Sequence, residues 1–128
     1  RLNLKFIHIS RIVLGFIFLV AGINGYFVIF HIDPFIETSP EAMALFTFDY
    51  LLIMEKTLEV ICGCLLLINR YVPLSLAFLS PIVANIFLLH VFLDHSLLLL
   101  AIILIILHSY LLFSYRKNFI KILEKKPL

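Results

Sequence analysis

Charged residues are scarce in this sequence. Asp, Glu, Lys and Arg make up 14% of its 128 residues, whereas an ordinary soluble domain has about 25%. Disordered chains and coiled coils need more polar sequence than this, which excludes both classes. The net charge of +2 is too small for a nucleic-acid-binding protein, and the basic residues stand at the ends of apolar segments rather than on one face. We therefore expect no nucleic-acid partner.

Cysteine is also rare. Two cysteines, Cys62 and Cys64, lie inside an apolar run and cannot form a disulfide framework. Residues two apart on a helix point to different sides, so a bond between these two would require the helix to unwind. We interpret both as small apolar packing residues.

Hydrophobic residues dominate the composition, at 63%. A chain this short has too much surface to hide so many apolar side chains in a soluble fold, which leaves an integral membrane protein. A helix needs about 20 residues to cross the hydrocarbon core of a bilayer. The sequence therefore predicts one all-α domain over residues 1–128, an integral membrane four-helix bundle. The four predicted spans are Ile9–Phe30, Tyr50–Ile68, Val72–Leu93 and Leu97–Tyr115.

Connections and flanking charges predict the topology. Short links at 69–71 and 94–96 make neighbouring helices antiparallel. If both termini are cytoplasmic, nine of the ten Lys and Arg residues fall on the cytoplasmic side, in agreement with the positive-inside rule. We expect a multi-pass protein of the bacterial inner membrane, whose basic tail, 116–128, lies along the anionic leaflet as an amphipathic helix. In the long outer loop, Ser39-Pro40-Glu41 has the pattern of a helix start and predicts a short surface helix, Pro40–Phe48.

Polar residues inside the spans are the candidate functional positions, because a charge near the middle of the bilayer costs about 2.5–3.5 kcal/mol. Glu55 and Glu59 share a helix face, and Lys56 can pair with Glu59. The helical rise of about 1.5 Å per residue puts Asn24, Glu55 and Asn85 at one level in the outer half. The sequence thus predicts a ligand-binding cluster that opens outward and consists of Asn24, Glu55, Lys56, Glu59, Asn85 and His90. The alternative is an internal ion pair that holds helices together.

Other features have structural interpretations. The first span carries a stripe with Gly15, Gly22 and Gly25, which predicts a close helix-packing seam. Pro81 predicts a bend in the third span. His108 stands alone on an apolar span and is interpreted as a hydrogen-bonded core histidine. A weak set of metal-ligand candidates, without a recognised spacing, consists of His31, His90, Asp94 and His95; the alternative is that these side chains reach toward interfacial water.

Several stretches resemble a known family. Ile12–Tyr26 is similar to the first span of DoxX-like membrane proteins, and Lys56–Leu67 to their second. Asn69–Pro73 resembles their short inner link, and Pro81–His90 their third span. This sequence departs from the family pattern at Cys62, Cys64, Leu89 and His95.

The resemblance implies a four-helix membrane bundle associated with membrane redox chemistry, because DoxX-like proteins are linked to quinone or thiosulfate oxidoreduction and to oxidative-stress complexes. It points to Asn24, Lys56, Glu59, Asn85 and His90. We expect a small accessory subunit of a membrane redox complex, with a quinone-like molecule as candidate ligand and with membrane lipid, other subunits or itself as partners. A purely structural subunit and a proton or small-solute path are the alternatives. No set of redox cofactor ligands is evident, so we do not expect electron transfer by this chain alone, and the sequence identifies no catalytic residue.

Overall fold

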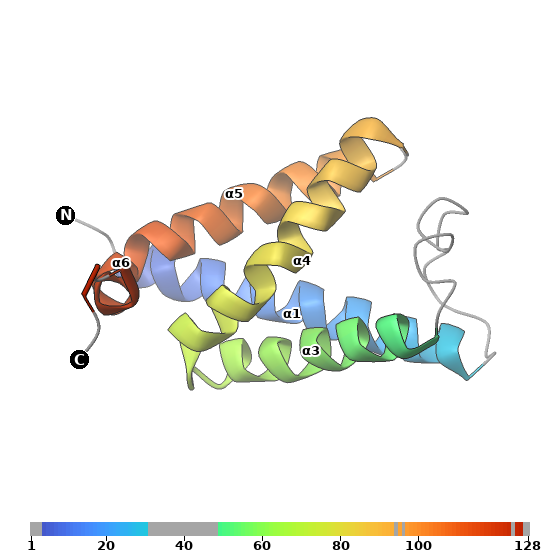
Figure 1. Cartoon of the computed structure of the whole chain (residues 1–128), viewed down its shortest axis with the longest axis horizontal. Coiled ribbons are helices and arrows are strands. Elements are labelled where there is room, and N and C mark those ends of the chain that lie inside the picture. Colours follow the sequence, from blue (N-terminus) through green and yellow to red (C-terminus); the bar gives the residue numbers. More distant parts are fainter. Residues whose placement is uncertain (1–3, 31–48, 94, 96, 124, 127–128) are drawn as a thin grey trace.

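The computed structural model describes residues 4–30, 49–93, 95, 97–123 and 125–126. Within these ranges the regular elements are all helical (Figure 1). Long helices are α1 (Leu4–Ile29), α3 (Asp49–Leu67), α4 (Val72–Phe92) and α5 (Leu98–Ser114). A short helix, α6 (Arg116–Phe119), and a 3₁₀ turn, η1 (Ile120–Leu123), follow α5. The all-α prediction is confirmed for the described part of the chain.

Local sequence explains where the third long helix begins. Residues 68–71 connect α3 to α4, and in this link Asn69 and Tyr71 adopt left-handed backbone conformations with φ of 58° and 52°. Such conformations turn the chain sharply, so α4 can return alongside α3. Pro73 lies in the first turn of α4, where its missing N–H would have had no helical acceptor in any case.

The long helices pack as neighbours around a ring (Figure 1). α1 lies antiparallel to α3, α3 contacts α4, α4 contacts α5, and α5 returns to α1. The start of α1, the link between α3 and α4, and α6 all lie at one end of the molecule. This arrangement matches the antiparallel order that the short links predict.

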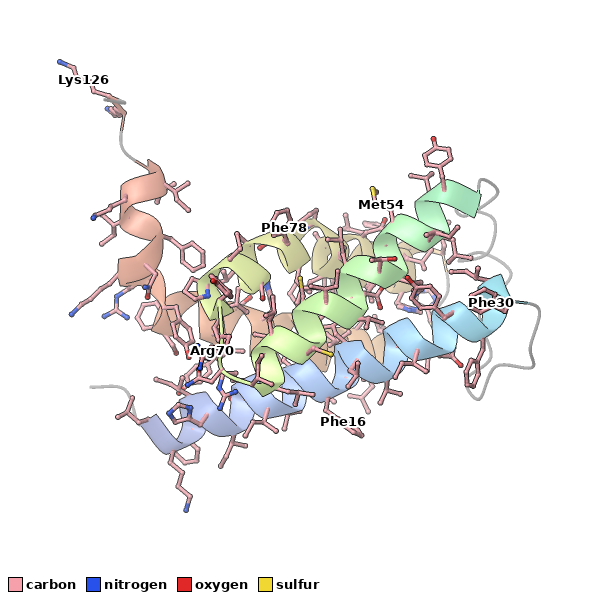
Figure 2. The ribbon with its side chains drawn as sticks, turned by 90° about the horizontal axis from the view of Figure 1, so that it is seen from below. Phe16, Phe30, Met54, Arg70, Phe78 and Lys126 are labelled. Carbon is pink, nitrogen blue, oxygen red and sulfur yellow. The ribbon has the colours of Figure 1, made fainter. Side chains whose placement is uncertain are left out.

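The interior of the ring is mainly apolar and closely packed, with Glu59, Ser75 and His108 among its buried polar residues. Each of the long helices contributes at least one side chain that is at most 1% exposed: Phe18, Leu14, Leu66, Leu76 and Leu111. The outer surface is apolar as well: Phe16, Met54 and Phe78 are more than half exposed and point away from the neighbouring helices (Figure 2). Helices that are apolar on both faces are typical of a protein surrounded by lipid.

Membrane-spanning candidates follow from length and apolarity. Over the described ranges, α1 and α4 are each long and apolar enough to cross a bilayer. A third candidate arises if α5 and Arg116–Leu123, which are bent by 73° from each other, count as one span. The prediction of membrane-spanning helices is therefore confirmed at the level of two to three spans.

Several element boundaries differ from the prediction. α1 begins at Leu4, five residues before the predicted start of the first span, and so includes Lys5 and His8 in its first turns. The predicted tail helix is present as α6 and η1, and no long continuous helix forms in the described part of the tail. The predicted surface helix Pro40–Phe48 lies outside the described residues.

Candidate functional site

A seam of glycines brings α1 and α3 into close contact. A Cβ atom placed on Gly22 would lie 2.6 Å from Val60 Cγ2 and 3.0 Å from the backbone nitrogen of Val60. A Cβ on Gly63 would lie 2.9 Å from the carbonyl oxygen of Gly15. Real Cβ atoms essentially never come closer than 3.0 Å to such a neighbour, so the absence of a side chain at Gly22 and Gly63 permits this close contact. The predicted packing seam is confirmed, and its partner is α3 of the same chain.

Lys56 lies where this seam meets the polar residues of α3. A Cβ on Gly25 would collide with the Cγ, Cδ and Cε atoms of Lys56, so the lysine stem covers the bare glycine of α1. Its ammonium nitrogen lies 3.2 Å from Oε2 of Glu59, one turn along α3. The predicted Lys56–Glu59 pair is confirmed. Because both residues belong to α3, the pair is internal to one helix and joins α1 only through the lysine stem.

Glu59 is the most deeply buried charged side chain in this region. It is 0% exposed, and Oε2 accepts a hydrogen bond from Lys56. The other oxygen, Oε1, has no hydrogen-bond partner among the described residues. A buried acceptor without a partner costs about 1–3 kcal/mol. Glu59 therefore has one buried acceptor oxygen without a hydrogen-bond partner among the described residues, in a group that it forms with Lys56 and Glu55.

The remaining predicted cluster residues are Glu55, Asn24 and His90, which are at least half-buried, and Asn85, which is exposed. Glu55 is half-buried and lies next to Lys56 and one turn before Glu59 on α3, whereas the Lys56 ammonium is ion-paired with Glu59. Asn24 is buried on α1 beside Gly25, and His90 is buried near the end of α4. Asn85, by contrast, is exposed on the outer surface of α4. The structure thus brings Glu55, Lys56 and Glu59 together and does not bring Asn85 into this interior group.

A hydrogen bond between Tyr26 and Thr57 supports the same region. The Tyr26 hydroxyl of α1 and Oγ1 of Thr57 on α3 are hydrogen-bonded, and the ring of Tyr26 stacks on Phe30 at a centroid distance of 6.1 Å. Sequence reasoning missed this pair. The sequence feature that could have indicated it is adjacency, because Tyr26 directly follows Gly25 and Thr57 directly follows Lys56.

Arg11 occupies the opposite end of the α1–α3 contact. It is 6% exposed and donates to the carbonyl oxygens of Leu66 and Leu67, the latter at 3.3 Å. These carbonyls belong to the last turn of α3, and the carbonyl groups of a last turn receive no hydrogen bond from an N–H group of the same helix. Arg11 therefore caps α3 from a different helix, a role that its position among the flanking cations did not indicate.

His108 joins α4 to α5. Its Nε2 lies 3.0 Å from the carbonyl oxygen of Leu76 and 3.5 Å from the Ser80 hydroxyl, so a protonated Nε2 donates to the carbonyl. The interpretation as a hydrogen-bonded core histidine is confirmed. Cys62 is buried and Cys64 is exposed, and both are free, so they point to different sides as expected. The interpretation as a packing residue is confirmed for Cys62 and is wrong for Cys64, which lies on the outer surface of α3.

Metal-ligand candidates do not assemble within the described ranges. There, no group of three or more His, Cys, Asp or Glu side chains is placed to hold an ion. His95 is exposed, with Nε2 2.8 Å from the carbonyl oxygen of Val91. His31 and Asp94 lie outside the described residues.

Comparisons with known proteins add no relative. No model of a protein family matches this chain, and neither the curated proteins nor the solved structures contain a match.

Proposed function

We propose that all four long helices cross the membrane, with both ends of the chain on the cytoplasmic side. α3 carries three charged residues in its middle, yet it runs antiparallel to α1 and adjoins α4, both of which are membrane-spanning candidates. The carboxylate of Glu59 is buried inside the bundle and does not face lipid. This lowers the cost of placing a charged residue of α3 within the membrane. The start of α1, Arg70 and α6 share one end of the molecule, in line with the positive-inside rule.

We further propose that the chain is an accessory subunit of a membrane redox complex and holds a quinone-like ligand at Glu59. The free Oε1 of Glu59 is the observation that carries this proposal. A quinol hydroxyl would donate to this carboxylate oxygen, and the adjacent Lys56 ammonium would donate to a quinone carbonyl. The Lys56–Glu59 pair therefore suits both oxidation states of such a headgroup. The resemblance to DoxX-like proteins supports the same chemistry.

The alternative functions receive less support. A structural subunit that used the glycine seam to bind partners would need that seam free, but α3 of the same chain covers it. A proton or solute path would need polar groups between Glu59 and the cytoplasmic end. On α1 and α3 the buried residues of that stretch include Phe18, Leu14, Cys62 and Leu66, which carry no charge. Its buried polar groups among the described residues are Ser75 on α4 and His108 on α5, and His108 already donates to the Leu76 carbonyl.

The test compares Glu59→Gln with the wild type and with Cys64→Ser, a control on the exposed face of the same helix. The full chain is extracted in mild detergent, and quinone retained per protein is measured after solvent extraction. Because glutamine is nearly isosteric but removes the charged acceptor, we expect a loss of at least about tenfold, the effect of a charge-assisted hydrogen bond. Cys64→Ser should retain the wild-type amount.

Equal retention by wild type and Glu59→Gln, or no quinone in the wild type, would overturn the ligand proposal. Far-UV circular dichroism checks that the variant keeps its helices. A photoreactive quinone analogue gives a second readout on the wild type alone, since it should label peptides of α3 around Glu59. Labelling confined to other helices would count against this site.

A further inference from the structure

Positive charge gathers at one end of the molecule. This end, which we refer to as the basic end, consists of the start of α1, the link between α3 and α4, and the segment formed by α6 and η1 (Figure 1). Figure 2 shows Arg70 and Lys126 there. The Lys and Arg residues of the basic end include Arg11, Arg70, Arg116, Lys117, Lys121, Lys125 and Lys126. Within the described ranges the acidic residues all belong to α3 and are Asp49, Glu55 and Glu59. The described part of the chain therefore has no acidic residue at the basic end to balance its positive charge.

The chain bends sharply where it enters this end. Arg116–Leu123, which forms α6 and η1, is inclined by 73° to α5. At the corner, Arg116 donates to the carbonyl oxygen of Phe113 at 2.9 Å, and its guanidinium carbon lies 4.3 Å from the centre of the Phe113 ring. These contacts hold Arg116 against the last turn of α5. Because α5 crosses the membrane in the proposed topology, the bent segment lies at a shallow angle to the bilayer surface.

Cationic and apolar side chains are mixed on the bent segment. Ile120, Ile122 and Leu123 are at least 60% exposed, and Lys117 and Lys121 are exposed as well. A basic segment with exposed aliphatic side chains binds at a bilayer interface, where the aliphatic groups enter the boundary between headgroups and acyl chains. Lys and Arg side chains near the membrane surface attract anionic headgroups. A second copy of the chain would instead bring like charges together, and a soluble polyanion would leave the aliphatic groups in water.

We propose that Arg116–Leu123 lies in the bilayer interface and that the basic end binds the phosphate groups of anionic phospholipids. The side chains of Ile120, Ile122 and Leu123 insert below the headgroups, while the Lys and Arg side chains extend to the phosphates. This proposal rests on the proposed topology, which places α5 across the membrane, and is independent of the quinone site. Its consequence is a local enrichment of anionic lipid around the basic end.

A single tryptophan can report which lipid covers the bent segment, because the sequence contains none of its own. The full chain with Ile122→Trp is reconstituted in equimolar phosphatidylcholine and phosphatidylglycerol, with bromine on the acyl chains of one lipid at a time to quench the fluorescence of a neighbouring tryptophan. We expect phosphatidylglycerol to bind beside this position at least about fivefold more strongly than phosphatidylcholine, the effect of one cation near the surface. Lys117→Gln combined with Lys121→Gln should remove most of this preference, whereas Lys121→Arg should keep it.

Phe92→Trp is the matched control, since Phe92 is as exposed as Ile122, at 72% against 73%, and lies at the end of α4 away from the basic end (Figure 1). Both lipids should quench it equally. Neither substitution alters a buried side chain, and far-UV circular dichroism checks that the helices are kept. Equal quenching by both lipids at Ile122→Trp, or the same preference at Phe92→Trp, would overturn the proposal.

The control also separates this proposal from the topology on which it rests. If Phe92→Trp is quenched and Ile122→Trp is not, the bent segment lies away from the bilayer, and the lipid proposal fails while the topology stands. If neither tryptophan is quenched, both fail. A preference that the two glutamine substitutions leave unchanged would show that these lysines do not bind the phosphates, which would also overturn the proposal.

Discussion

The close approach of α1 and α3 predicts that Gly63→Ala destabilises the protein. The new Cβ would lie 2.8 Å from the backbone nitrogen of Leu19, 2.9 Å from the carbonyl oxygen of Gly15 and 3.2 Å from Leu19 Cα. These are backbone atoms, which cannot rotate away as the end of a side chain can. The two helices must therefore move apart by a few tenths of an ångström along their contact.

The expected magnitude combines two opposing effects. Overpacking of a close-packed interior costs about 1–3 kcal/mol. Alanine has a better helix propensity than glycine by about 1 kcal/mol, which offsets part of that cost. The difference is a net loss of up to about 2 kcal/mol in the free energy of unfolding, or up to about 30-fold in the equilibrium constant.

Gly25→Ala is the matched comparison. It gains the same helix propensity, but the three nearest atoms to its Cβ belong to the flexible stem of Lys56. The Lys56 stem can rotate, whereas the backbone atoms around Gly63 cannot, so Gly25→Ala should be less destabilising than Gly63→Ala. The sequence has no tryptophan, and unfolding in mixed detergent micelles is therefore followed by far-UV circular dichroism. The reasoning fails if Gly63→Ala is as stable as the wild type, or if Gly25→Ala is the more destabilised of the two.

Two further substitutions test the hydrogen bonds between helices. Arg11→Met removes the donors to the Leu66 and Leu67 carbonyls, and we expect a loss of about 2 kcal/mol in the same unfolding assay, with Arg11→Lys intermediate; an unchanged midpoint for Arg11→Met would contradict the capping role. His108→Leu removes one donor to the Leu76 carbonyl, which the Ser80 hydroxyl also contacts at 2.9 Å, so a smaller loss of about 1 kcal/mol is expected. A larger loss for His108→Leu than for Arg11→Met would reverse this ranking and count against it.

Features set by residue size or by spacing along one helix were predictable from the sequence. The glycine stripe of α1 identified a packing seam because the absence of a side chain is itself visible in the sequence. The Lys56–Glu59 pair followed from a separation of three residues, which places two side chains on one helix face. Both predictions were independent of how the helices pack against one another. The opposing Gly63, by contrast, was not linked to Gly15, because that contact joins α1 to α3 only after the chain folds.

Features set by the rotation of one helix against another were not predictable. The helical rise gave the depth of Asn85, but the face on which it lies depends on how α4 packs against α3 and α5. The sequence therefore grouped Asn85 with Glu59, and the structure places Asn85 on the opposite, outer side. Arg11 presents the same difficulty, because its acceptors lie 55 and 56 residues away in the chain. A flanking cation and an interhelical cap look identical in sequence.

Glu59 and Asn85 can be separated because they face different surroundings. Lys56, Arg11 and His108 each donate to an acceptor within the chain, whereas Glu59 Oε1 and the Asn85 amide have no such partner among the described residues. Glu59 faces the interior and Asn85 faces outward, so a ligand held at Glu59 does not meet Asn85. Asn85→Leu should therefore retain the quinone that Glu59→Gln loses, in the same extraction assay. Loss of quinone in both variants would mean that the proposed site extends to the outer face of α4.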